Sequence, residues 1–215
     1  SIITPLIGIG QPNLLMFEPT YADELEIILR YTFAYMQDPK GSSVYLRLST
    51  RNIPQIKREI NEKIEEEILS GGYWLEKSKN KSNITIVFSG VMAPEVFEAL
   101  EILKEDNLDV SVLSITSGDR LYKNWKEAQK QRSIGNKVLS RIEELFLDTR
   151  KESVIVTLID AHSSSLTWIG GAVGKKTVSL GVDEFGQSGN LKDLYQHYSI
   201  DADAIVDACA QALSN

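Results

Sequence analysis

The hydrophobic and polar positions of this 215-residue chain change their period several times. Short apolar or alternating runs predict strands, whereas apolar residues spaced three and four apart predict helices. From residue 82 onward the two kinds of element alternate, which is typical of parallel strands joined by helical crossovers. We therefore expect an α/β fold, a three-layer αβα sandwich around a mostly parallel sheet, with strands at 84–88, 109–115, 153–159 and 176–181.

The helices of this expected sandwich lie between the strands and after the last one. Apolar faces indicate them near 94–103, 119–149, 166–171, 191–198 and 201–213. Pro94 is tolerated in the first turn of its helix, where its missing N–H would have no partner. The strand at 153–159 is the most apolar, so we expect it near the centre of the sheet, where both faces are covered.

The first part of the chain has a less regular pattern. Proline and glycine interrupt residues 1–19, which we expect to form loop and a short strand. Thr20 with Asp23 resembles a capping box at the start of a helix that ends before Pro39, and a strand at 43–49 follows. A helix followed by a strand is half of a βαβ unit. Because the chain also opens in the middle of an apolar pattern, we expect it to be a fragment of a longer polypeptide.

Residues 52–72 predict an exposed helix rich in charge. Isoleucine recurs every four residues from Ile56 to Ile68, and Gly71-Gly72 ends the pattern. This helix is either a partner-binding surface or a solvated linker, and the linker is the simpler interpretation. The polar residues 76–82 then mark a boundary. The chain is therefore expected to divide into residues 1–50, 51–81 and 82–215.

Composition constrains partners and location. The net charge of −7, without a basic cluster, argues against nucleic acid or an anionic membrane as a partner. No apolar run approaches the roughly 20 residues of a membrane span. Cys209 is the one cysteine and lies in an apolar helical pattern, where a buried structural thiol is more plausible than a nucleophile. This cysteine usage fits a reducing, cytoplasmic compartment.

Ligands of open parallel sheets gather beyond the carboxyl ends of the strands. His162 follows the strand at 153–159, with Asp160 two residues before it. It is either a base that contacts substrate or a hydrogen-bonded histidine in a tight turn. His197 lies in a polar helical pattern and is expected on the surface.

Other polar residues at these strand ends give weaker signals. Ser89-Gly90 could hold an anion through free N–H groups, or could serve packing alone. Arg47 and Arg51 could meet a carboxylate or phosphate, although surface ion pairs are simpler. Asp183 and Glu184 are adjacent and point apart in an extended stretch, which is poor for a shared metal. No G-x-S-x-G turn, P-loop or paired metal-ligand spacing occurs.

The stretch SLGVDEFGQSGNLKDLYQHY, residues 179–198, is the most distinctive in the chain. It begins in a strand, breaks at a glycine-rich turn and continues as a helix. Gly181, Gly186 and Gly189 predict a backbone that needs positive φ or close approach of a neighbouring segment.

Three stretches resemble the C-terminal third of the homodimeric pyruvate dehydrogenase decarboxylase subunit, in the thiamine-diphosphate transketolase superfamily. They are residues 17–55 (FEPTYADEL to RNIPQ), 68–75 (ILSGGYWL) and 179–213, where GVDEFGQSGNLKDLY is the most specific motif. The strand that ends in Ser89-Gly90 and residues 110–125 fit the same pattern. The resemblance implies the end of a pyrimidine-binding domain at residues 1–50 and a transketolase-type C-terminal domain from residue 82.

The resemblance also implies an activity for the parent protein. Its family decarboxylates a 2-oxo acid with thiamine diphosphate and Mg²⁺ and then acylates a lipoyl group on the acyltransferase core. A homodimer and that core are the implied partners. The G-D-G…N-N diphosphate motif and the glutamate that activates the aminopyrimidine ring are absent from this chain. We therefore expect no bound cofactor or metal and no turnover by this chain alone.

No catalytic residue carries over firmly from the resemblance. His162 and Arg51 are retained as candidates for the rim of the active site, and Arg51 is one position from the phosphate-binding arginine of transketolases. Two other functions stay open. One is a fragment of a transketolase-type ketol transferase, although the stretch ILSGGYWL argues against it. The other is a stand-alone binding or oligomerisation module of the same fold.

Overall fold

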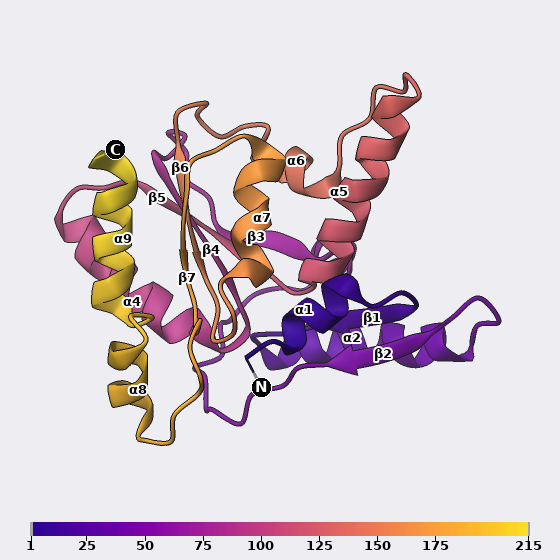
Figure 1. Ribbon diagram of the computed structural model, residues 1–215, viewed down its shortest axis with the longest axis horizontal. Helices are drawn as coiled ribbons and strands as arrows, with labels where there is room; N and C mark the ends of the chain where they lie inside the picture. The colour runs from indigo at the N-terminus through magenta and orange to yellow at the C-terminus, as the bar shows by residue number, and fades with distance from the viewer. Residues whose placement is uncertain (1, 215) are drawn as a thin grey trace.

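The computed structural model describes residues 2–214 and contains two sheets (Figure 1). The smaller sheet pairs β1 (Leu14–Phe17) in parallel with β2 (Ser43–Leu46). The larger one has five strands in the order β3-β5-β4-β6-β7. Its strands are β3 (Gly72–Glu76), β4 (Ile84–Ser89), β5 (Val110–Ile115), β6 (Val154–Leu158) and β7 (Thr177–Leu180).

Helices cover both faces of the five-stranded sheet and make three layers (Figure 1). One face packs against α4 (Ala93–Glu105) and α9 (Ala202–Ser214), with α8 (Leu191–His197) beside them. The other face packs against α5 (Gly118–Ser133), α6 (Arg141–Phe146) and α7 (Ser164–Val173). The predicted α/β sandwich is therefore confirmed.

Strand pairing within this sheet is parallel except at one edge. β4 pairs in parallel with both β5 and β6, and β7 pairs in parallel with β6. The central strand is β4 rather than β6, which lies next to it, and all six residues of β4 are buried. The edge strand β3 pairs antiparallel with β5 and was missing from the sequence prediction. The sheet thus begins at Gly72, while the division into residues 1–50, 51–81 and 82–215 stays a prediction.

The helix predicted over 52–72 is wrong in its first half. Residues 52–61 adopt neither helix nor strand, and α3 spans only Glu62–Ser70. Arg58 anchors this segment to its neighbours, because its guanidinium binds both the Asp23 carboxylate and the Tyr73 hydroxyl at 2.7 Å. Tertiary contacts therefore override the isoleucine periodicity. The predicted stop is correct, since Gly71 adopts φ 111° after the last turn.

Two N-terminal predictions also need correction. Residues 4–10 form helix α1 (Thr4–Gly10), not a loop, because Pro5 lies in the first turn, where a proline costs little. Helix α2 (Ala22–Gln37) is capped one residue later than predicted. The Glu24 carboxylate, rather than Asp23, accepts hydrogen bonds from the main-chain N–H groups of Thr20 and Tyr21.

The helix predicted over 119–149 is two helices. Gly135, at φ 92°, lies in the break between α5 and α6. Ser140 and Glu143 form a capping box that starts the second helix. A glycine at positive φ and a new cap together end one helix and begin the next.

Of the two reasons expected for the glycines of the distinctive stretch, positive φ does not apply to Gly181, Gly186 or Gly189. Gly181 is instead required by close approach, because a Cβ there would lie 2.6 Å from the Ala161 carbonyl oxygen and from the Ser163 nitrogen. A Cβ on Gly186 would meet nothing within 4 Å. The two glycines of one loop therefore have different structural importance.

We predict that Gly181→Ala lowers the free energy of unfolding by about 2 kcal/mol or more, because backbone atoms would have to move. The matched change Gly186→Ala should alter it by no more than about 0.5 kcal/mol. Urea denaturation of both variants tests this. Equal effects of the two substitutions would contradict the assignment of close packing to Gly181.

Candidate functional site

The carboxyl ends of both sheets meet at a cluster of charged side chains. Arg47 follows β2, Glu18 follows β1 and Asp160 lies just beyond β6. The Arg47 guanidinium forms ion pairs with the carboxylates of Glu18 and Asp160. It also donates a hydrogen bond of 2.9 Å to the main-chain oxygen of Asp160. One arginine thus joins the two sheets.

Glu18 is buried against the turn that follows β4. Gly90 adopts φ +60° there, and a Cβ on it would lie 2.5 Å from Glu18 Oε1. The Thr20 hydroxyl donates to the Gly90 carbonyl oxygen at 2.9 Å, and the Glu18 N–H donates to the Thr116 carbonyl oxygen at 2.8 Å. The Ser89-Gly90 turn, considered above as an anion site, therefore packs against a carboxyl group of the chain itself.

Burial governs the proton affinity of this cluster. It raises the pKa of Glu18 from 4.5 to about 7; the Arg47 charge opposes this shift and the Asp160 charge adds to it. Burial disfavours the charge on Arg47, but the two carboxylates outweigh it and raise the pKa of that guanidinium. Arg47 therefore stays charged, while Glu18 can exchange a proton near neutral pH.

Arg51 belongs to a second ion pair on the same edge. Its guanidinium lies 2.8 Å from Glu95 Oε2, at the start of α4, and 5.5 Å from the centre of the Tyr195 ring. Burial, with Asp160 and Glu95 nearby, raises the pKa of Tyr195. An open groove of about 650 Å³ runs between α4, α8 and the start of α9 and is lined by all three of these side chains.

A cavity of about 250 Å³ lies beside the ion pairs of Arg47. Its walls include Glu18, Arg47 and Asp160, together with the segment of Ser49 and Thr50. The lining offers guanidinium donors, carboxylate acceptors and hydroxyl groups, which suit a small polar molecule. Among residues 2–214 no group of three or more His, Cys, Asp or Glu side chains could hold a metal ion.

His162 lies at the same edge and does not pair with Asp160, its neighbour in the sequence. Asp160 binds Arg47, whereas His162 Nδ1 lies 2.8 Å from Ser164 Oγ and 3.5 Å from Asp183 Oδ1. Asp183 also accepts hydrogen bonds of 2.8 Å from the main-chain N–H and the hydroxyl of Ser163. His162 is thus built into the turn that starts α7, and its role at the rim stays a prediction.

The remaining candidates occupy ordinary positions. Cys209 is fully buried, and burial raises the pKa of its thiol to about 12, in agreement with a structural role. His197 is exposed at the end of α8, as predicted. Glu184 is exposed, while Asp183 is bound to Ser163, so the two do not form a shared site.

Sequence reasoning missed Glu18, Glu95 and Tyr195. A usable signal existed for Glu18, because an acid followed by proline directly after an apolar run predicts a carboxylate at a strand end. No comparable signal existed for Glu95 or Tyr195, which lie on helices and become neighbours of Arg51 only through the tertiary fold.

The structure describes no helix long and apolar enough to cross a membrane within residues 2–214.

Residues 71–201 match the pattern of the transketolase-like TK C-terminal domain. The pyruvate dehydrogenase E1 component of Pseudomonas aeruginosa is 26% identical over 212 residues, which are 95% of this chain and 24% of that protein. The chloroplastic transketolase of Craterostigma plantagineum is 28% identical over 206 residues, or 95% of this chain and 35% of that protein. The chain thus spans well under half the length of either relative.

Solved structures show the same fold at low identity. A split-gene transketolase, described as an inactive β4 tetramer, superimposes with a TM-score of 0.69 at 18% identity and covers 100% of this chain and 62% of that one. Transketolase from Leishmania mexicana gives a TM-score of 0.70 at 17% identity over 99% of this chain and 27% of that one.

The raised pKa of Glu18 predicts a pH dependence of stability. The folded chain binds this proton more tightly than the unfolded chain, so the contribution of Glu18 is fully present below pH 4.5. It is lost as the pH rises to about 7, at no more than about 1.4 kcal/mol per pH unit. In Glu18→Gln this loss should disappear from urea denaturation curves recorded between pH 4.5 and 8.

The control is Glu98→Gln, which removes an exposed carboxylate from α4. This variant should retain the pH dependence of the unchanged protein. A Glu18→Gln profile parallel to that of the unchanged protein would show that Glu18 titrates normally.

Proposed function

Because the chain belongs to the family of transketolase-like C-terminal domains, we propose that it forms the C-terminal part of a thiamine-diphosphate-dependent 2-oxo acid dehydrogenase acting on pyruvate. Relatives named pyruvate dehydrogenase E1 component occur in Pseudomonas aeruginosa and Escherichia coli. The motif GVDEFGQSGNLKDLY favours the same branch. Transketolases are equally similar, so a transketolase-type ketol transferase is the second candidate.

The observation that carries the proposal is the incomplete small sheet. Parallel strands normally belong to larger sheets covered on both faces. On the edge of β1 that faces away from β2, the main-chain groups of Met16 find partners at the start of α5. The Asp119 carboxylate accepts from the Met16 N–H at 3.2 Å, and the Ser117 hydroxyl donates to the Met16 oxygen at 2.5 Å. Among the described residues only β1 pairs with β2.

Exposed apolar side chains accompany the open edge of β2. Phe33 and Met36 on α2 are 61% and 42% exposed, and Leu48 after β2 is 53% exposed. Further strands of a pyrimidine-binding domain would pair with β2 and cover such residues. This supports a chain that completes a larger enzyme rather than a stand-alone binding module, which is the third candidate.

In this proposal the rest of the enzyme binds thiamine diphosphate and Mg²⁺, since the diphosphate motif is absent from the chain. The chain supports a homodimer and the edge of the active site, in a cytoplasmic enzyme that delivers its acyl group to a lipoyl acyltransferase core. The description of the split-gene transketolase as an inactive β4 tetramer supports the inference that this part alone has no activity.

Arg51 favours the oxo acid over a phosphorylated sugar. It lies one position from the phosphate-binding arginine of transketolases, and its guanidinium is already bound to Glu95 at 2.8 Å. An arginine engaged in this way attracts a substrate phosphate less strongly. This contact therefore supports the pyruvate assignment.

The proposal predicts the activity of the complete gene product that contains this chain. With thiamine diphosphate and Mg²⁺ it should reduce an artificial electron acceptor in the presence of pyruvate. It should not transfer a ketol group between sugar phosphates. Ketol transfer without pyruvate-dependent reduction would establish the second candidate instead.

Calorimetric titration of the 215-residue chain with thiamine diphosphate is the accompanying control. We expect no heat of binding, because the cofactor contacts lie elsewhere in the enzyme. Binding with a micromolar dissociation constant would support the stand-alone module.

A further inference from the structure

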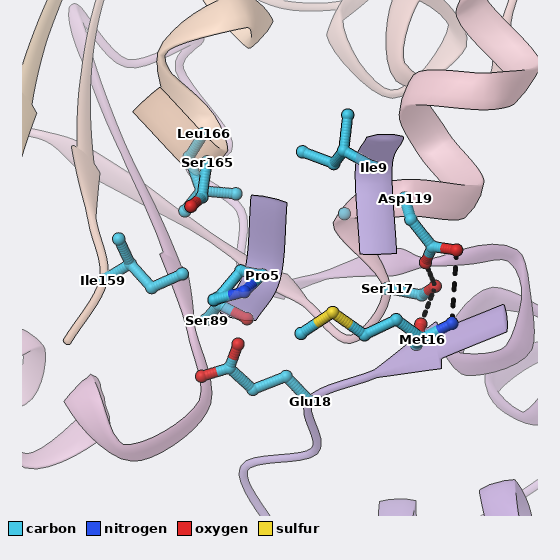
Figure 2. Close-up of a pocket in the computed structure, with 11 residues that line it drawn as sticks. Pro5, Ile9, Met16, Glu18, Ser89, Ser117, Asp119, Ile159, Ser165 and Leu166 are labelled. Carbon is cyan, nitrogen blue, oxygen red and sulfur yellow. Dashed lines mark hydrogen bonds between the residues drawn. The ribbon is translucent and has the colours of Figure 1, made fainter. Parts of the chain in front are cut away.

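A second, smaller cavity is also lined by Glu18 (Figure 2). Its volume is about 20 Å³, enough for one water molecule and too small for a larger ligand. Pro5 and Ile9 of α1 form one wall, and Ile159 lies across from them. Pro5, Met16 and Ile159 are buried, so the cavity lies within the junction between the N-terminal elements and the main sheet.

The polar lining of this cavity is incomplete. Ser165, in the first turn of α7, is 2% exposed, and its hydroxyl has no hydrogen-bond partner among the described residues. A buried hydroxyl without a partner is destabilising, because folding has removed its hydrogen bonds to water. The Glu18 carboxyl group and the Ser89 hydroxyl line the same space (Figure 2). Ser89 Oγ donates to the Ile115 oxygen at 2.9 Å, so its single proton is used and its lone pairs can accept. The same hydroxyl also lies within hydrogen-bond reach of the Glu18 carboxyl group.

We propose that this cavity holds one structural water molecule, which hydrogen-bonds the Ser165 hydroxyl, the Ser89 hydroxyl oxygen and the Glu18 carboxyl group. Three such partners are the usual number for a buried water. The water links the ends of β1 and β4 to the first turn of α7. Among the described residues the Ser165 hydroxyl makes no hydrogen bond of its own to these segments.

A water molecule also suits a carboxyl group that changes its protonation state. It donates to the ionised Glu18 and accepts from the protonated form, so neither state leaves a buried polar atom without a partner. The charged groups near Glu18 are Arg47 beyond β2, Asp160 beyond β6 and Asp119 on α5. Asp119 is already bound by Ser117 and Lys123, so it does not compete for the water.

The substitution Ser165→Ala distinguishes a filled cavity from an empty one by the sign of its effect. With the water present, the change removes one of its partners and should lower the equilibrium constant for folding about fivefold or more. With the cavity empty, the change removes only an unpaired hydroxyl, and the constant should stay equal or rise. Urea denaturation of the complete gene product provides the measurement, and an equal or higher constant overturns the proposal.

Thr157→Val is the matched control. The Thr157 hydroxyl is also buried without a partner, but Thr157 does not line this cavity. Its replacement should leave the equilibrium constant for folding unchanged or raise it.

A crystal structure at about 1.5 Å resolution gives an independent test. Electron density for a water within hydrogen-bond distance of Ser165 Oγ and the Glu18 carboxyl supports the proposal, and an empty cavity refutes it.

Discussion

Arg47 makes the ion pairs on which the junction of the two sheets depends. Its guanidinium binds Glu18 from the N-terminal elements and Asp160 from the main sheet, and all three side chains are largely removed from water. Removing one member of such a buried group typically costs about 3–5 kcal/mol, because a charge is left without its partner. The arginine therefore fixes the position of the small sheet even though each sheet has its own apolar core.

A second polar cluster also joins the N-terminal elements to the main sheet. Glu24 is fully buried at the start of α2, where it accepts from the Tyr73 hydroxyl of β3 and pairs with Arg58. An apolar core that includes Phe17, Ile28 and Ile68 packs the same elements together. Polar contacts orient the N-terminal elements, while this core supplies their hydrophobic stabilisation.

The periodic parts of the fold were predictable from sequence, and the tertiary exceptions were not. Strands such as β4 are apolar enough to be found by pattern alone, and alternation with helices gives a parallel sheet. The sequence did not predict β3, because its five residues directly follow a helical pattern. Its pairing partner β5 also lies far along the chain. The segment 52–61 has helical periodicity, yet it forms no helix and its Arg58 binds Asp23 and Tyr73 of other elements.

The residues of the candidate site show the same difference between local pattern and tertiary contact. Sequence neighbours suggested a pair of His162 and Asp160, but the partner of Asp160 is Arg47, 113 residues away. Which residues lie at strand ends could be read from the pattern, whereas which of them meet depends on how the small sheet docks. Arg51 was correctly placed near a carboxylate, although Glu95 itself could not be named from sequence.

Cys209 has a practical consequence as the one thiol in the chain. It is enclosed by α4, α9 and the main sheet, and its high pKa leaves almost no thiolate at neutral pH. An alkylating reagent can therefore reach a reactive sulfur only when α9 separates from the sheet. The rate of labelling reports the opening of that layer directly, without an introduced probe.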